Sequence, residues 1–343
     1  MNILDKASEI ARLDSSGMSH NIIHMPQDIL WGYEKSTVEF SADFARDLGS
    51  KKRVIIVAAR QDIFAAEIIY AQYSASLKLD LSLPEDLKAI DENALYIFLD
   101  YAGQNEKLAK LLEQVVEKNC PIGLVGSAAV LPSGCHNSLC VKLAQGKLSR
   151  MALPYTFTAL IRIMEEFQIV PSQAKLINQI VASLITRAGA LAAHVKSDLN
   201  FGKISAQKIA GKIPLIISDD HQLRFLAKYW KQQFNLNSKI PAFYGDILPF
   251  SQDQQHRLLI KNFDNIIPIF IKRFANISAN NQHLEDFIQY LSLQKKEYLE
   301  FYTEGKNMVS EYFSLIYLGA MISCYLAFLQ QKDPAENLRK ENK

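Results

Sequence analysis

The chain has little of several things that would assign it to a specialised class of protein. Only four of its 343 residues are cysteine, and they lack the density and spacing of a disulfide framework. We therefore expect reduced thiols and a cytoplasmic location. No run of lysine and arginine is long enough to track a phosphate backbone, and 38 basic residues almost balance 36 acidic ones, so nucleic acid is not an expected partner. The first residues alternate charged and apolar side chains, which is not typical of a secretory signal.

Motifs for metal binding and for nucleophilic catalysis are also sparse. Cys135, His136 and Cys140 offer three ligands close together, but a zinc site needs a fourth ligand and usually two cysteines separated by two residues. We interpret them as incidental loop residues and expect no metal or cofactor. The sequence contains no phosphate-binding P-loop and no evident nucleophile–His–acid arrangement.

One apolar segment, residues 312–329, carries no charge and approaches the roughly 20 residues that span a bilayer. The helical pattern starts nearer Lys306, however, and includes Glu311. Gly319 and Ser323 suit close packing between helices. We therefore expect a helix buried inside the protein and no membrane span.

Short apolar runs alternate with helical periodicity in the first half of the chain. Buried strands are predicted at residues 53–59, 96–99 and 121–125, because each run is short, continuous and rich in apolar residues. Helices are predicted from Asp62 onward and over residues 106–119. This alternation is typical of a doubly wound parallel sheet, and the fold class is therefore α/β.

The second half repeats this order of elements without a residue-level repeat. A chain of this length is too long for one ordinary core, so we predict two domains, residues 1–170 and 171–343, with the boundary near Pro171. Residues 141–154 look irregular. The elements expected after them are helices over residues 155–167, 171–195, 223–234, 283–293 and 306–329, and strands at residues 213–218, 258–260, 266–270 and 298–302.

Several stretches carry a resemblance to a known family. Residues 149–154 (SRMALP) are similar to Pro-Arg-x-Ala-Leu-Pro, and residues 234–240 (FNLNSKI) to Phe-Asn-Glu-Asn-x-Lys-Ile; residues 247–249 and 326–334 also agree, as does the spacing. In these stretches the chain resembles the bifunctional phosphoglucose/phosphomannose isomerase family, whose members interconvert glucose or mannose 6-phosphate with fructose 6-phosphate. The resemblance extends along nearly the whole chain. It implies two SIS (sugar isomerase) domains, each a doubly wound, mostly parallel sheet flanked by helices, and a homodimer.

Leu236 stands where the family has its general base, a glutamate. Moving a proton between adjacent carbons of a sugar needs a base, which contributes about 10²- to 10⁴-fold to the rate. A leucine cannot accept a proton. The resemblance implies that Asn235, Leu236 and Asn237 are substrate-binding positions.

The phosphate-binding motifs of the family are also altered. Residues 58–63 (AARQDI) replace Gly-Met-Gly-Gly-Ser-Gly, whose glycines allow close approach to an anion at a helix N-terminus. Residues 100–105 (DYAGQN) replace the phosphate loop Ser-Tyr-Ser-Gly-Asn-Thr and keep none of its hydroxyls. A carboxylate at Asp100 about 4 Å from a phosphate would repel it by roughly 4 kcal/mol at a dielectric near 20. Asp62, Asp100 and Asn105 are the positions that would contact the substrate.

Two catalytic positions follow from the resemblance. Arg150 matches the arginine that helps to stabilise the enediolate, and it can act as such an oxyanion clamp or form a structural ion pair. His256 reaches the position of the ring-opening histidine only if a gap of a few residues is allowed.

Asp219, Asp220 and His221 follow a predicted strand of the second half. Ligands bind at such strand ends in open α/β folds, so the three residues could form an acid/base cluster. The other interpretation, which we prefer, is that Asp219 or Asp220 caps the next helix.

Two hypotheses about function remain open. In the first, the chain is a noncatalytic relative that binds a sugar derivative, a sugar phosphate or a protein partner. In the second, it is an active aldose–ketose isomerase that relies on Arg150 and on a base such as His256, His221 or Asp253. The altered motifs favour the first hypothesis.

Overall fold

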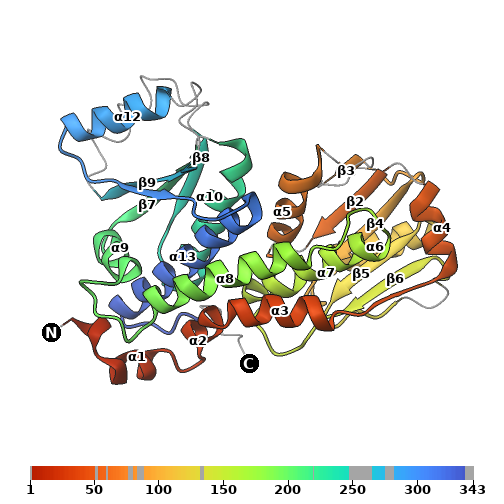
Figure 1. Ribbon diagram of the computed structural model, residues 1–343, viewed down its shortest axis with the longest axis horizontal. Coiled ribbons are helices and arrows are strands. Elements are labelled where there is room, and N and C mark those ends of the chain that lie inside the picture. Colours follow the sequence, from red (N-terminus) through yellow and green to blue (C-terminus); the bar gives the residue numbers. More distant parts are fainter. Residues whose placement is uncertain are drawn as a thin grey trace. The chain divides into compact units, whose positions relative to one another are not determined.

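The computed structural model describes residues 2–50, 53–58, 61–75, 80–82, 89–131, 135–218, 220–246, 265–274 and 282–336. The chain packs into two compact units. One is Met25–Val181, and the other combines Met1–His24 with Ala182–Lys343. Each unit contains one sheet flanked by helices, which confirms the predicted α/β class (Figure 1). The boundary of the two SIS domains at residues 170/171 stays a prediction.

The first unit contains a six-stranded sheet. Its strands lie in the order β1-β6-β5-β4-β2-β3, and all neighbours are parallel except β1 and β6. The three strands predicted in this half are confirmed as β2, β4 and β5, whereas β1, β3 and β6 were not predicted. The bounds are β1 (Val38–Phe40), β2 (Arg53–Ala58), β3 (Asp80–Ser82), β4 (Ala94–Leu99), β5 (Ile122–Gly126) and β6 (Ser138–Lys142).

Apolar side chains of helices cover this sheet. Leu108 and Val115 of α6 are buried in one cluster with Tyr96 and Phe98 of β4. The helix predicted over residues 106–119 is confirmed as α6, with an apolar face on the sheet. The helices of this unit are α3 (Met25–Lys35), α4 (Ala42–Ser50), α5 (Ile63–Tyr73), α6 (Glu106–Glu117), α7 (Leu153–Glu166) and the first part of α8 (Ala174–Leu191).

The second unit contains a four-stranded parallel sheet in the order β10-β9-β7-β8. Ile217 and Phe270 of this sheet pack against Leu284 and Phe287 of α12. The predicted strand at residues 258–260 lies outside the described residues. The bounds are β7 (Ile213–Ser218), β8 (Phe243–Asp246), β9 (Ile266–Lys272), β10 (Leu299–Tyr302), α9 (Phe201–Ile209), α10 (Arg224–Gln233) and α12 (Gln282–Leu293).

The long apolar segment forms α13 (Met308–Leu329). By length and composition this helix could cross a membrane, but 94% of its most apolar window is buried. Gly319 shows how closely it packs, because a Cβ at this position would lie 2.5 Å from Nε1 of Trp230. The same indole N–H donates a hydrogen bond to the carbonyl of Leu315 at 2.9 Å. The expectation of a buried helix is confirmed.

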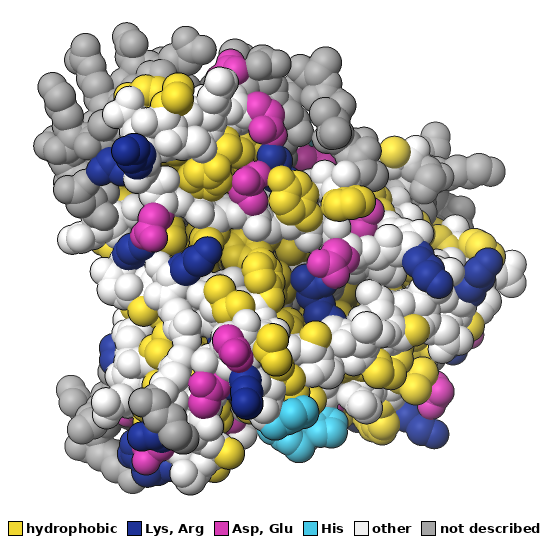
Figure 2. Space-filling model, turned by 60° about the vertical axis from the view of Figure 1, so that its left-hand side comes forward, with side chains coloured by type: hydrophobic (Ala, Val, Ile, Leu, Met, Phe, Trp, Pro, Cys, Tyr) yellow, Lys and Arg dark blue, Asp and Glu magenta, His cyan; other side chains and the backbone are white. Residues whose placement is uncertain are grey.

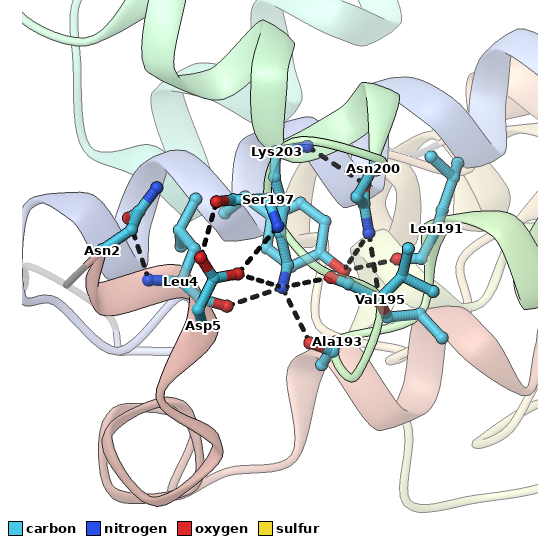
Figure 3. A network of polar contacts seen from close by, with 11 residues as sticks. Asn2, Leu4, Asp5, Leu191, Ala193, Val195, Ser197, Asn200 and Lys203 are labelled. Atoms are coloured by element: carbon cyan, nitrogen blue, oxygen red, sulfur yellow. Dashed lines mark hydrogen bonds and ion pairs between the residues drawn. The ribbon is translucent and has the colours of Figure 1, made fainter.

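Lys203 explains why the first residues pack with the second unit. Its side chain on α9 is fully buried, and Nζ donates to the carbonyls of Leu4, Ala193 and Val195 at 2.6, 2.8 and 2.7 Å (Figure 3). Asp5 lies 3.6 Å from the same ammonium group. These contacts hold the N-terminal segment, which consists of η1 (Ile3–Asp5), α1 (Ala7–Leu13) and α2 (Met18–Ile23), within the unit.

Candidate functional site

The order of the strands indicates where a ligand would bind in each sheet. In the first sheet the chain passes from β2 to β3 on one side, and then to β4 on the other side of β2. In the second sheet β7 lies between β8 and β9 in the same way. Open α/β sheets bind ligands outside the carboxyl ends of the strands at such switch points. The side chains that follow these strands are therefore the first to consider.

Asp62 lies between β2 and α5 and is 2% exposed. Its Oδ2 accepts the backbone N–H of Tyr101 at 2.9 Å, while Oδ1 is buried and has no hydrogen-bond partner in the described part of the chain. Burial raises the pKa of Asp62 from 3.8 to about 7; the Tyr101 N–H opposes this shift and the charge of Asp100 adds to it. Asp62 is therefore a mixture of acid and carboxylate near neutral pH.

Asp100 follows β4 and uses both carboxylate oxygens inside its own loop. Oδ1 accepts the N–H of Gly103 at 3.0 Å, and Oδ2 accepts the N–H of Asn105 at 2.9 Å. Asn105 in turn caps α6, because its Oδ1 accepts the N–H groups of Lys107 and Leu108 at 3.1 and 3.3 Å. Backbone N–H groups in such loops can form concavities that bind anions. Here they are bound to side-chain oxygens of the chain itself.

Tyr101 and Gly126 fix the position of this loop. The Tyr101 hydroxyl accepts the N–H of Lys147 at 3.1 Å, and the Tyr101 carbonyl accepts the hydroxyl of Ser127 at 2.6 Å. Gly126 ends β5 and leaves no room for a side chain, since a Cβ there would lie 2.2 Å from the carbonyl oxygen of Asp100. The ends of β4 and β5 therefore hold Asp100 in place.

Arg150 belongs to the same unit, in the short helix η2 (Ser149–Met151), and is 7% exposed. Residues on either side of it in the sequence bind one carboxylate. Lys147 Nζ and the Tyr155 hydroxyl donate to Asp28 at 2.9 and 2.7 Å. A buried guanidinium in this setting fits both a structural ion pair and an oxyanion clamp, so both interpretations stay open.

An ion cluster occupies the switch point of the second sheet. Arg273 follows β9 and donates to Asp220 at 3.0 Å, to Glu311 at 3.1 Å and to Gln222 at 3.1 Å. One cation therefore lies between two carboxylates, and its charge is already neutralised. Asp220 also accepts the N–H of Gln222 at 2.7 Å, which confirms the predicted helix cap, whereas Asp219 lies outside the described residues.

Leu236 lies in a π-helix, Phe234–Ser238, that continues α10. The neighbouring Asn237 is fully buried, and its Nδ2 donates to the hydroxyl of Ser323 on α13 at 2.9 Å. Asn235 has a buried Oδ1 that lacks a partner in the described segments, and Leu236 is partly exposed. Asn237 thus anchors the π-helix on α13.

The predicted site residues divide between the two units. The unit Met25–Val181 holds Asp62, Asp100, Asn105 and Arg150; the other unit holds Asn235, Leu236 and Asn237. The structure brings Asp62, Asp100 and Asn105 together in one loop region, whereas His256 lies outside the described residues. The sequence prediction did not include Tyr101, whose backbone N–H binds Asp62. It also did not include Arg273, which follows a predicted strand just as Asp220 does.

The remaining expectations concern metals and surface charge. Within the described ranges, no three His, Cys, Asp or Glu side chains form a group that could hold a metal ion. All four cysteines are free thiols. On the face shown in Figure 2, acidic and basic side chains are interspersed among the atoms that are described.

Comparisons with known proteins agree with this architecture. Residues 199–337 match the family described as the bacterial phospho-glucose isomerase C-terminal SIS domain. A bifunctional phosphoglucose/phosphomannose isomerase of Caldicellulosiruptor bescii is 23% identical over 255 residues, which cover 71% of this chain and 74% of that protein. One of Thermoplasma acidophilum is 22% identical over 317 residues, with 88% and 91% covered. A solved structure of tagatose-6-phosphate ketose/aldose isomerase from Escherichia coli shares the fold, with a TM-score of 0.68, 10% identity and 96% and 98% coverage.

Proposed function

Because this chain belongs to the bifunctional phosphoglucose/phosphomannose isomerase family of SIS-domain proteins, we propose that it binds a sugar derivative without catalysing the isomerisation. The observation that carries this proposal is Leu236. The π-helix around it is held in place by Asn237 and Ser323, yet the side chain at the position of the base is a hydrocarbon.

The switch point of the first sheet supports the same proposal. Asp100 accepts the N–H groups of Gly103 and Asn105, and Asp62 adds a second acidic group beside it. A phosphate dianion at this edge would meet like charges and backbone donors that are already bound. The loop that the family uses for phosphate is therefore unsuited to it in this chain.

An active isomerase is the second candidate, and the retained, buried Arg150 favours it. Under this alternative Arg150 stabilises the enediolate, and a base other than residue 236 removes the proton. His221 is exposed, and His256 and Asp253 lie outside the described residues. We prefer the noncatalytic function because it explains the changes at both Leu236 and Asp100.

The test is an isomerase assay on the purified full-length protein. We expect no conversion of fructose 6-phosphate or mannose 6-phosphate, and none by the Leu236→Glu variant, because a new carboxylate does not restore the phosphate loop. Leu236→Gln, of similar size but without a base, is the matched control. Robust turnover by the unmodified protein would overturn the proposal in favour of the active isomerase.

The proposal includes a homodimer, which the resemblance implies, and a cytoplasmic location, which the sparse cysteines indicate. The four free thiols are compatible with a reducing compartment. Size-exclusion chromatography with light scattering measures the oligomeric state directly, and a monomer would contradict this part of the proposal.

A further inference from the structure

A buried oxygen without a hydrogen-bond partner in the described residues lies at the edge of the first sheet. Asp62 is 2% exposed and points toward the end of β4, where its Oδ2 accepts the Tyr101 N–H. Its Oδ1 has no hydrogen-bond partner in the described part of the chain. Buried polar atoms in native proteins are nearly always hydrogen-bonded, so an exception needs an explanation such as a ligand or an ordered water.

The chain itself supplies the negative charge at this edge. The two carboxylate oxygens of Asp100 accept N–H groups at 3.0 and 2.9 Å, which is how a loop of this kind would hold phosphate oxygens. The first N–H groups of α6 are bound to Asn105. Of the groups named in this subsection, Oδ1 of Asp62 is the one that has no partner in the described residues and can therefore bind a ligand.

The groups at this edge of the sheet determine which class of ligand it can bind. A sugar hydroxyl can donate a hydrogen bond to Asp62 Oδ1 whether Asp62 is ionised or not, and it can accept one when the acid is protonated. A phosphate would place two further negative charges beside Asp100. An ammonium group would lie near the N-termini of α5 and α6, where the helix dipoles disfavour positive charge.

We propose that the switch point between β2 and β4 binds the hydroxyl groups of an uncharged sugar and rejects phosphorylated sugars, with the Asp100 carboxylate in the place of the phosphate. This inference rests on the sugar-derivative binding proposed above and specifies the class of ligand for that function. Asp62 is the binding residue, and Asp100 sets the specificity.

The experiment is a ligand-observed NMR titration of the full-length protein with fructose, mannose and glucose and with their 6-phosphates. Wild-type protein should bind at least one free sugar about tenfold or more tightly than its 6-phosphate. In Asp100→Asn this preference should shrink by about tenfold, because the amide removes the charge and keeps one acceptor oxygen. Glu106→Gln is the control. It removes a charge from the exposed first residue of α6, the helix that follows the Asp100 loop, and should change the preference less than about threefold.

The outcomes separate this inference from the proposed function. Tighter binding of a 6-phosphate than of its free sugar by wild-type protein would overturn the inference and leave the proposed function intact. An unchanged preference in Asp100→Asn would overturn the assignment of specificity to this residue. If none of the six compounds binds, both the inference and sugar binding as such fail.

Discussion

At Asp62, burial and a neighbouring carboxylate act in the same direction. The pKa rises from 3.8 to about 7 mainly because the buried side chain loses water, and Asp100 contributes further. Between these two values the folded protein holds a proton that the unfolded chain releases. The contribution of Asp62 to the free energy of unfolding should therefore be fullest below about pH 4, fall by at most about 1.4 kcal/mol per pH unit up to about pH 7, and stay level above it.

The Asp62→Asn variant tests this linkage. The amide keeps an oxygen for the Tyr101 N–H but does not titrate, so its free energy of unfolding should fall less steeply than that of the wild type between pH 5 and pH 7. Urea denaturation at several pH values measures both slopes. Glu113→Gln, an exposed position on α6, is the control and should follow the wild type; parallel curves for all three proteins would refute the assignment.

At the scale of helices and strands, packing leaves the sequence of α13 little freedom to change. It is covered on nearly every side, and the backbone at Gly319 touches the indole of Trp230. A helix in this position must combine an apolar surface with small residues where partners approach. The charge-free sequence at residues 312–329 predicted the burial, and Gly319 predicted the close contact.

Gly319→Ala should lower the free energy of unfolding by about 1–3 kcal/mol, because the added methyl group overlaps a rigid indole ring. Gly189→Ala is the matched control. Gly189 lies on α8 with nothing within 4 Å of an added Cβ, so the higher helix propensity of alanine should stabilise the protein by up to about 1 kcal/mol. Chemical denaturation distinguishes the two signs, and a neutral Gly319→Ala would contradict the packing described.

Edge strands were harder to predict than central ones. The predicted strands β2, β4 and β5 lie inside the sheet and have continuous apolar sequences, whereas β1 and β3 are three residues long and lie at its edges. β6, with the sequence SLCVK, has no such run. It becomes a strand because β5 and β1 pair with it on both sides. Such pairing is not visible in a local pattern.

At the scale of the whole molecule, the two ends of the chain belong to one packing unit. Met1–His24 joins Ala182–Lys343, and Lys203 provides a buried ammonium group for the carbonyl of Leu4. Desolvation lowers the pKa of Lys203, and Asp5 partly offsets this effect. Three backbone carbonyls therefore depend on the Lys203 side chain for a hydrogen-bond donor.

Lys203→Met should remove about 3–5 kcal/mol of stability, because it leaves buried carbonyls without a donor. We expect hydrogen exchange to rise first in residues 2–24, which this side chain holds in place. Lys208→Met changes an exposed lysine of the same helix and should alter stability by less than about 0.5 kcal/mol. Equal exchange in the N-terminal segment of both variants would show that Lys203 does not hold it.

The residues of the site could be predicted from the sequence, but the contacts between them could not. Asp62 and Asp100 were identified through the family motifs, yet nothing local indicates that Asp62 bonds to the backbone of Tyr101, 39 positions away. Likewise the cap at Asp220 was foreseen, while its ion pair with Arg273 depends on the parallel pairing of β7 and β9. Contacts of this kind arise from topology.

The most direct test of the central claim follows one proton. Isomerisation removes the C2 hydrogen of an aldose phosphate to form an enediolate, and a base in the site lets deuterium from solvent replace it. Mannose 6-phosphate incubated in D₂O with the purified protein can be followed by NMR. Because Leu236 stands where the family has its base, we predict the same exchange as with heat-denatured protein. Faster exchange with the native protein would contradict it.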